Sequence, residues 1–292
     1  MKAVVTGATG NVGAHVVREL RRHGIEPRAF VRDRDKAVRT LGDDVELAVG
    51  SFSDRDSLER ALDGAEGLFL ACANVREQVE YECAAIDAAR AAGVRRIVKL
   101  SGPRAAVDSW LLFERWHGEI ERHLFASGVP WVVLRPSAYM TNLLASAGTV
   151  RHTGRLFAPA GTARITYVDP RDVAAAAVAT LAVAGHEGSI YTITGREAIT
   201  YDQIAQELSA ATGRTIEFVD IPYDAAREAM REAGLPPMIA DSIVDVFVTQ
   251  QAGSMTRTTD AVGTLTGRTP RTFASFAREH AALFGAAVAA AS

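Results

Sequence analysis

Residues 2–13 read KAVVTGATGNVG, and the architecture of this 292-residue chain can be worked out from them. The first four are a short apolar run, which a turn with glycines at positions 7, 10 and 13 follows directly. An apolar helical pattern then continues to Gly24. A strand, a glycine-rich turn and a helix in this order predict a dinucleotide cradle, although the spacing is GxxGxxG and not the usual GxGxxG.

Each glycine of this turn has a physical role. Gly7 permits the tight turn, Gly10 lets the backbone approach a pyrophosphate, and Gly13 allows the helix to pack closely on the strand. The helix N-terminus offers free N–H groups and the positive end of the helix dipole to phosphates. A plain strand-to-helix turn is the alternative, but it would not need three glycines and two threonines.

The bulk composition restricts the class of protein. The net charge is −3 with signs mixed along the chain, so we expect neither nucleic acid nor a membrane surface as a partner. The first predicted strand begins at Lys2, which leaves no room for a signal peptide. Cys72, Cys83 and the scattered histidines lack metal-ligand spacing, so we expect no metal and reduced thiols. These features and the Ala, Arg and Asp content favour a bacterial, cytoplasmic protein.

Strand and helix patterns alternate over the first two thirds of the chain. Short apolar runs predict further strands at 26–31, 45–49, 67–71, 96–100 and 130–134, and amphipathic patterns predict helices at 75–92 and 112–126. Such strands between such helices are typical of a parallel sheet that is covered on both faces. The predicted fold is α/β, a doubly wound, Rossmann-like parallel sheet with ligands outside the C-terminal strand ends.

The last third is less regular. We expect strands at 165–168 and 190–194, helices at 170–184 and 201–212, a loop over 148–161, mostly helix beyond 221, and a frayed tail at 286–292. The predicted NAD(P)-binding domain is 1–138, completed by 165–195. A smaller, mostly helical substrate-binding region takes 139–164 and 196–292.

The residues after the second strand bear on the choice of dinucleotide. The chain reads VRDRDK at 31–36. A guanidinium such as that of Arg32 can grip a 2′-phosphate with two hydrogen bonds, and Lys36 lies one helical turn further on. Asp33 or Asp35 could instead meet a ribose hydroxyl, and a solvated turn of alternating charge is a further alternative. We predict NADPH (NADP+) in preference to NADH.

The chain resembles the NmrA-like, atypical branch of the short-chain dehydrogenase/reductase family, which includes isoflavone-reductase-like enzymes, quinone and azo reductases, and redox-sensing regulators. The resemblance rests on seven segments in order along the chain. They are TGATGNVG at 6–13, FVRDRDK at 30–36, GSFSDRDSL at 50–58, AGVRRIVKLS at 92–101, WHGEIERHL at 116–124, SGVPWVVLRPSAYMTN at 127–142 and ITYVDPRDVA at 165–174.

The resemblance also implies a set of cofactor-binding residues. Those implied at the pyrophosphate are Gly7, Thr9, Gly10, Asn11, Val12 and Gly13, with Arg32 and Lys36 at the 2′-phosphate, Ser51 and Phe52 at the adenine, and Ala71 and Cys72 at the nicotinamide ribose. Lys99 to Ser101 and Pro136 to Tyr139 end the fifth and sixth strands, where nicotinamide and substrate should meet.

The chain departs from the family at the catalytic pair. Typical members carry Tyr-x-x-x-Lys after the fifth strand, with both side chains on one helix face. Aligned on Glu121, the corresponding residues here are Phe113 and His117. Phe113 has no proton to donate. His117 is either a core histidine satisfied by a carbonyl, or a residue at the cofactor edge that bonds ribose or substrate and titrates near neutrality.

Two further residues are candidates for catalysis. Tyr139 is a second potential proton donor or a simple lining residue, and Ser101 either matches the family's catalytic serine or caps a strand end. We therefore predict an NADPH-dependent reductase that transfers hydride to a small quinone, imine or iminium ion, or activated C=C bond. A non-catalytic NADP(H) sensor of NmrA type and an isomerase are the alternatives. Secondary metabolism is the expected setting, and homodimerisation is left open.

Overall fold

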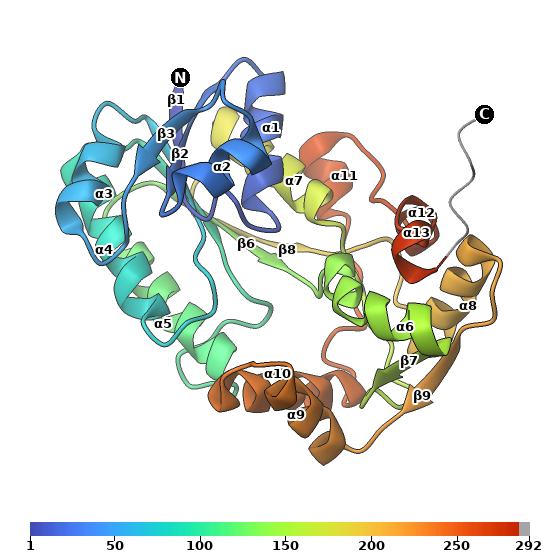
Figure 1. Ribbon diagram of the computed structural model, residues 1–292. Coiled ribbons are helices and arrows are strands. Elements are labelled where there is room, and N and C mark those ends of the chain that lie inside the picture. Colours follow the sequence, from blue (N-terminus) through green and yellow to red (C-terminus); the bar gives the residue numbers. More distant parts are fainter. Residues whose placement is uncertain (286–292) are drawn as a thin grey trace, which may run out of the picture. The chain divides into compact units, whose positions relative to one another are not determined.

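The computed structural model describes residues 1–285, and the fraying expected for 286–292 lies outside this range. Backbone contacts divide the chain into two compact units. Unit 1 comprises Met1–Pro136, Pro170–Ile193 and Ala261–Arg268, and unit 2 comprises Ser137–Asp169, Thr194–Asp260 and the chain from Thr269 onward. The elements of each unit can be followed in Figure 1.

Unit 1 is built on a parallel sheet. Within residues 1–285 it has seven strands in the order β3-β2-β1-β4-β5-β6-β8, and every neighbouring pair is parallel. The strands are β1 (Lys2–Val5), β2 (Glu26–Val31), β3 (Glu46–Val49), β4 (Gly67–Leu70), β5 (Arg96–Leu100), β6 (Trp131–Pro136) and β8 (Ser189–Ile193). The strand order reverses between β1 and β4, and ligands of doubly wound sheets bind beyond the strand ends at such a point. The predicted doubly wound, Rossmann-like fold is confirmed.

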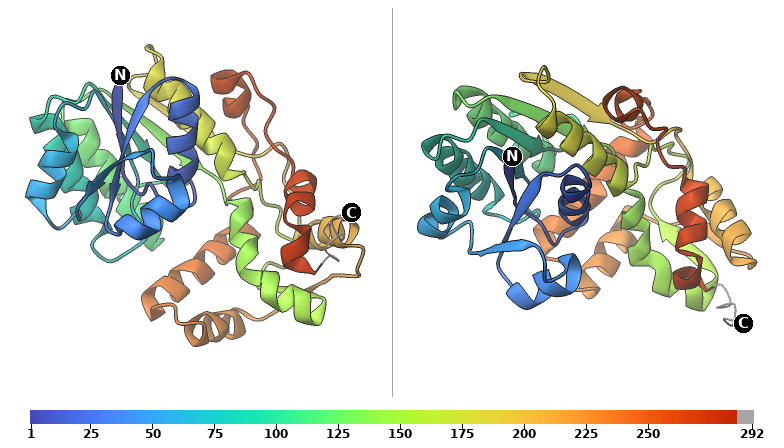
Figure 2. Two further views of the ribbon diagram at one scale, coloured as in Figure 1. Left: turned by 45° about the horizontal axis from the view of Figure 1, so that its top comes forward. Right: turned by 90° about the horizontal axis from the view of Figure 1, so that it is seen from above.

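Helices cover both faces of this sheet (Figure 1, Figure 2). The helices of unit 1 are α1 (Gly13–Arg22), α2 (Arg34–Leu41), α3 (Arg55–Leu62), α4 (Gln78–Ala91), α5 (Leu112–Ala126), α7 (Pro170–Ala182) and α11 (Ala261–Thr266). Helices α1, α7 and α11 pack side by side, as do α3, α4 and α5. Between the sheet and the second set lies a core that includes Leu68, Ile97 and Ile120, none of which is exposed. Burying each such side chain contributes about 1.5–3 kcal/mol.

Unit 2 is mostly helical. Its elements are the 3-10 helix η1 (Met140–Ser146), α6 (Ala147–Thr153), β7 (Arg155–Ala158), α8 (Tyr201–Thr212), β9 (Glu217–Asp220), α9 (Tyr223–Glu232), α10 (Pro237–Gln251), α12 (Phe273–Glu279) and α13 (Ala281–Phe284). Strands β7 and β9 pair in parallel. Helix α8 begins at a capping box, in which Thr200 accepts from the Gln203 backbone and Gln203 reaches back to Thr200, so both orphan donors are satisfied locally.

Two expectations for unit 2 are wrong. The predicted loop at 148–161 contains most of α6 and all of β7. Leu156 is buried and Phe157 is exposed, so the alternation of a half-covered strand is present but only four residues long. Within residues 1–285, the predicted strand at 165–168 forms two isolated bridges and no ladder, Ile165 with Ile199 and Val168 with Tyr139.

Three further features of residues 1–285 are the character of the helices, the grouping of potential metal ligands and the state of the cysteines. Within residues 1–285, no helix has the length and apolar character that crossing a bilayer requires. The same part of the chain holds no cluster of three or more His, Cys, Asp or Glu side chains suited to a metal ion. Both cysteines are free thiols.

Candidate functional site

The turn after β1 folds tightly on itself. Gly7 has a φ of +59°, which favours glycine, and the Gly10 N–H donates to the Gly7 carbonyl at 2.9 Å. A Cβ atom at Gly13 would lie 2.1 Å from that same carbonyl oxygen. Glycine is therefore required at position 13 because the first turn of α1 rests directly on the loop backbone.

The N-terminus of α1 is uncapped. Its N-cap residue, Val12, makes no side-chain cap hydrogen bond, and the first turn carries no acidic residue. Among residues 1–285, the N–H groups of Val12 and Gly13 have no protein acceptor. By contrast, Asp33 caps α2 and Asp54 caps α3. The likewise uncapped α4 and α5 carry Glu80 and Glu114 in their first turns. Free N–H groups at the positive end of a helix dipole suit a phosphate, so these residues fit the pyrophosphate of a dinucleotide.

The end of β4 lies against the same turn. The Thr6 hydroxyl donates to the Ala71 carbonyl at 2.9 Å and accepts from the Ala71 N–H at 2.8 Å. The Ala71 carbonyl oxygen is 3.0 Å from the place a Cβ would take at Gly7. Burial raises the pKa of Cys72, the next residue, to about 11, so Cys72 remains a thiol at neutral pH. The structure thus brings Ala71 and Cys72 to the cradle.

Arg32 and Lys36 are both exposed around the N-terminus of α2. Asp33, the acid next to Arg32, accepts a hydrogen bond from the Lys36 backbone N–H at 2.9 Å. Asp33 therefore caps α2 through one carboxylate oxygen, and a contact of Asp33 or Asp35 with a ribose hydroxyl stays an open alternative. The contact of Arg32 and Lys36 with a 2′-phosphate stays a prediction.

Ser51 and Phe52, the residues implied at the adenine, follow β3. The Ser51 N–H donates to the Ser57 hydroxyl at 3.1 Å. The Phe52 ring stacks on Tyr81 of α4, with 5.8 Å between ring centroids and 8° between planes. The contact of Tyr81 with Phe52 could not be predicted from the sequence, because Tyr81 belongs to an amphipathic helix with no motif of its own.

Ser101 is held in a buried polar network. Its hydroxyl donates to Glu121 Oε1 at 2.6 Å. Arg135 donates from Nε to the same oxygen at 3.0 Å, and its Nη2 donates to Glu121 Oε2 and, at 3.0 Å, to the Ala105 carbonyl. The only hydroxyl proton of Ser101 is therefore engaged with a carboxylate. This hydrogen bond ties the end of β5 to α5, and a role of Ser101 in proton transfer, which stays a prediction, would require the contact to break.

Within residues 1–285, His117 faces a lysine ammonium and makes no hydrogen bond to a backbone carbonyl. Lys99 Nζ lies 3.2 Å from His117 Nδ1, and because an ammonium can only donate, Nδ1 must accept and the ring proton must be on Nε2. Burial, followed by the charges of Lys99 and Arg135, lowers the pKa of His117 well below its usual value. The expected carbonyl partner is replaced by Lys99 and the lowered pKa contradicts titration near neutrality, while a contact of His117 with ribose or substrate stays a prediction.

Lys99 itself is not exposed at all. Its ammonium lies 2.6 Å from Glu82 Oε2, as an ion pair without hydrogen-bond alignment, and donates to the Leu100 carbonyl at 2.6 Å. Burial raises the pKa of Glu82, against the opposing effect of Lys99, and Gln78 donates to Glu82 Oε1 at 3.0 Å. The Lys99 ammonium thus hydrogen-bonds the Leu100 carbonyl and His117 Nδ1 and has Glu82 as its counter-ion, and its contact with a cofactor stays a prediction. In the sequence, the buried position of Lys99 is indicated by a lysine inside the apolar strand RIVKL.

Tyr139 in unit 2 follows the end of β6 and precedes η1. Burial raises the pKa of its hydroxyl, which makes Tyr139 a weaker acid than an ordinary tyrosine. Among residues 1–285 its hydroxyl has no hydrogen-bond partner.

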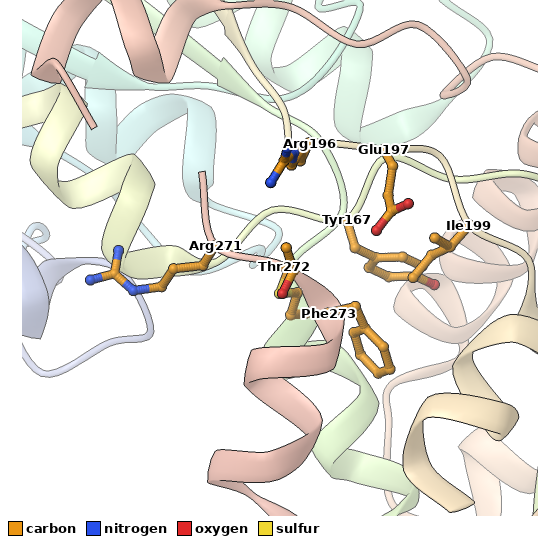
Figure 3. A pocket seen from close by; sticks show the side chains of 8 residues that line it. Tyr167, Arg196, Glu197, Ile199, Arg271, Thr272 and Phe273 are labelled. Atoms are coloured by element: carbon orange, nitrogen blue, oxygen red, sulfur yellow. The ribbon is translucent and has the colours of Figure 1, made fainter. Parts of the chain in front are cut away.

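A small cavity in unit 2 is lined by Met140, Tyr167, Arg196, Glu197, Ile199, Arg271, Thr272 and Phe273. Figure 3 shows that Arg271 points away from the other labelled side chains. The cavity volume of about 10 Å³ has room for one water molecule and for no organic substrate.

Comparisons with known proteins agree with this fold and cradle. The pattern of the NmrA-like family matches residues 1–267. An NAD(P)H azoreductase from Xenophilus azovorans is 37% identical over 284 residues, covering 97% of this chain and 99% of the azoreductase. A (4-alkanoyl-5-oxo-2,5-dihydrofuran-3-yl)methyl phosphate reductase from Streptomyces griseus is 39% identical over 282 residues, covering 96% of this chain and 98% of the reductase.

A solved structure is similar over nearly the whole chain. The NADPH-dependent quinone oxidoreductase from Escherichia coli, complexed with NADPH, has a TM-score of 0.86 and 30% sequence identity. The match covers 95% of this chain and 99% of the oxidoreductase. From the family match and these similarities it follows that the chain belongs to the NmrA-like family.

Proposed function

We propose that this protein, an NAD(P)H-dependent oxidoreductase, is a reductase that passes hydride from NADPH to a small, fairly apolar organic acceptor. The acceptor is a quinone, an imine or iminium ion, or an activated C=C bond. Residues 1–138 with 165–195 bind the cofactor, and 139–164 with 196–292 bind the acceptor. A homodimeric assembly, a bacterial cytoplasmic location and a role in secondary metabolism belong to the same proposal.

The observation that carries the proposal is the uncapped N-terminus of α1. The N–H groups of Val12 and Gly13 have no acceptor within residues 1–285, and no acidic residue lies in the first turn. A pyrophosphate supplies the missing acceptors and the negative charge. The azoreductase and quinone oxidoreductase among the relatives support the same cofactor chemistry.

The choice of acceptor follows from the weakness of the available acids. Phe113 has no hydroxyl, His117 is neutral because of its buried, cation-lined position, and burial raises the pKa of Tyr139. Bound NADPH would supply hydride, while the chain positions the reactants and excludes water. Acceptors that need little acid assistance therefore suit this protein best, with the final proton taken from water.

Two measurements test the proposal. Calorimetry with NADPH and NADH should show binding of both, with NADPH the tighter ligand. The absorbance of NADPH should then fall in the presence of at least one member of a panel of quinones, imines and enones. Tight binding without consumption on any acceptor would contradict the reductase and favour a cofactor sensor.

Paired variants identify the residues that meet the acceptor. Turnover should survive in Tyr139→Phe and collapse in His117→Ala, while both variants keep their affinity for NADPH. The opposite pattern would transfer the role to Tyr139.

A further inference from the structure

We propose that Glu82 and Lys99 are positioning residues that hold His117 with its proton on Nε2, so that His117 serves the reaction as a neutral hydrogen-bond donor and not as a proton-transferring acid. This inference rests on the proposed function, in which His117 meets the acceptor or the ribose. It adds two residues and a mode of action to that site.

The three side chains form one contact chain across unit 1. Glu82 comes from α4, Lys99 from the central strand β5 and His117 from α5. The contacts run from Glu82 Oε2 to Lys99 Nζ at 2.6 Å and from Lys99 Nζ to His117 Nδ1 at 3.2 Å. Glu82 and Lys99 are fully buried, whereas His117 keeps 9% of its surface exposed. This series of contacts therefore begins in the core and ends at a residue with an accessible edge.

The donor–acceptor inventory sets the tautomer. An ammonium has three N–H groups and no acceptor, so Nδ1 of the facing imidazole carries a lone pair. The ring proton must then lie on Nε2, which within residues 1–285 has no hydrogen-bond partner. A donor with no protein partner on a partly accessible edge is available to a ligand atom.

Packing holds the ring in place from the other side. A Cβ atom at Gly102 would lie 2.7 Å from His117 Cδ2, so the ring rests on the backbone of the loop after β5. One residue along α5, a Cβ at Gly118 would lie 2.3 Å from the Ala106 carbonyl carbon. The imidazole is thus confined between the Lys99 ammonium and a closely packed loop.

The charges around His117 disfavour its protonation. Lys99 of β5 and Arg135 of β6 are the cations that act on it. Glu82 of α4 and Glu121 of α5 supply the negative charges, but each is already paired with one of those cations. A proton added to the ring would face a buried ammonium at 3.2 Å, and no carboxylate of residues 1–285 contacts the ring to compensate that repulsion.

A contribution to stability alone does not explain the buried ion pair of Glu82 and Lys99. Bringing a carboxylate and an ammonium out of water carries a desolvation cost that often equals or exceeds their attraction, so apolar residues of similar size commonly do as well. An ion pair with no exposure on either side is better explained by the group it controls. Here that group is His117, whose Nε2–H can stabilise the negative charge that develops on the acceptor when hydride arrives.

Nitrogen NMR on the full-length protein tests the tautomer directly. Spectra of ¹⁵N-histidine protein with NADPH bound, assigned with His117→Gln, should show the Nε2–H form of His117 unchanged between about pH 5.5 and 8. In Lys99→Met the ring should lose this fixed state and titrate within that pH range, because the ammonium that donates to Nδ1 and repels a second proton is gone. Wild-type His117 that titrates near neutrality, or a ring that keeps its fixed state in Lys99→Met, would overturn the proposal.

Kinetics test the mode of action. His117→Gln places an amide N–H near the former Nε2 but has no acid to offer, and it should retain most of the turnover. His117→Leu should lower kcat by about 10²–10³-fold, the usual effect of removing one such donor. Lys99→Met should lower kcat by roughly 10²-fold through misplacement of the ring, with the KM for NADPH unchanged. Equal loss in His117→Gln and His117→Leu would contradict the donor role.

Two variants separate this inference from folding defects. Glu82→Gln combined with Lys99→Met leaves no lone buried charge and should reproduce the loss of the fixed ring state and of kcat. Glu19→Gln removes a buried acid that pairs with Arg22 and Arg268 instead, and should leave both readouts unchanged. If NADPH binds but no acceptor is ever reduced, the proposed function fails, while the NMR result still decides whether Lys99 sets the tautomer.

Discussion

Adding one methyl group at Gly13 should disrupt the nucleotide cradle. In Gly13→Ala the new Cβ would lie 2.1 Å from the Gly7 carbonyl oxygen, 2.7 Å from its carbon and 3.0 Å from Ala8 Cα. All three are backbone atoms, so no side chain can rotate away, and the first turn of α1 must move by about 1 Å. We expect a loss of about 1–3 kcal/mol in the free energy of unfolding, the usual cost of overpacking.

The same displacement should weaken cofactor binding. A charge-assisted hydrogen bond contributes about 1.5–3 kcal/mol, so losing one N–H contact to the pyrophosphate raises the Kd of NADPH by roughly 10- to 100-fold. Thermal unfolding and fluorescence titration with NADPH measure the two effects. Gly148→Ala is the matched control because a Cβ there meets nothing within 4 Å. If Gly13→Ala melts and binds NADPH as Gly148→Ala does, the steric reasoning is refuted.

Arg32→Ala should weaken NADPH by about 1.5–3 kcal/mol and leave NADH nearly unaffected in calorimetry; equal losses would remove Arg32 from the 2′-phosphate. Ser101→Ala should lower the unfolding free energy by about 1–3 kcal/mol, since Glu121 loses a donor, but should spare turnover; a collapse of kcat at intact stability would restore a catalytic role. Burial raises the pKa of Cys72 and Cys83 to about 11, so mass spectrometry should find both unalkylated by iodoacetamide at pH 8. The two buried thiols contribute their full stabilisation of the fold below about pH 9, and this stabilisation is lost as pH rises toward 11. Rapid labelling of the folded protein would contradict the raised pKa of these thiols.

The sheet of unit 1 could be predicted because each of its strands is a short apolar run between amphipathic helices. Residues 155–158 were missed for a different reason, since β7 is only four residues long and pairs with β9, some sixty residues later. Residues 165–168 have strand-forming composition, but Ile165 and Val168 bridge to different segments in opposite directions. No continuous ladder can grow from two such bridges.

The candidate site, too, could be predicted from the sequence only in part. The cradle could be located because strand, turn and helix are contiguous in sequence, and the cofactor residues beyond it were carried over from the family resemblance. The partners of Lys99 and Ser101 could not be predicted, because Glu82 and Glu121 lie on separate helices and only packing selects them. The tautomer of His117 depends on a single 3.2 Å contact, which leaves no trace in residue spacing.

The location of the buried ammonium restricts the substitutions open to this chain. A lysine at position 117, where the family resemblance places one, would bring a second cation against Lys99 with one carboxylate, Glu82, already committed to the first. Like charges confined at that depth repel strongly. The two positions should therefore be coupled: a lysine at position 117 on α5 should be tolerated only when position 99 on β5 is no longer a lysine.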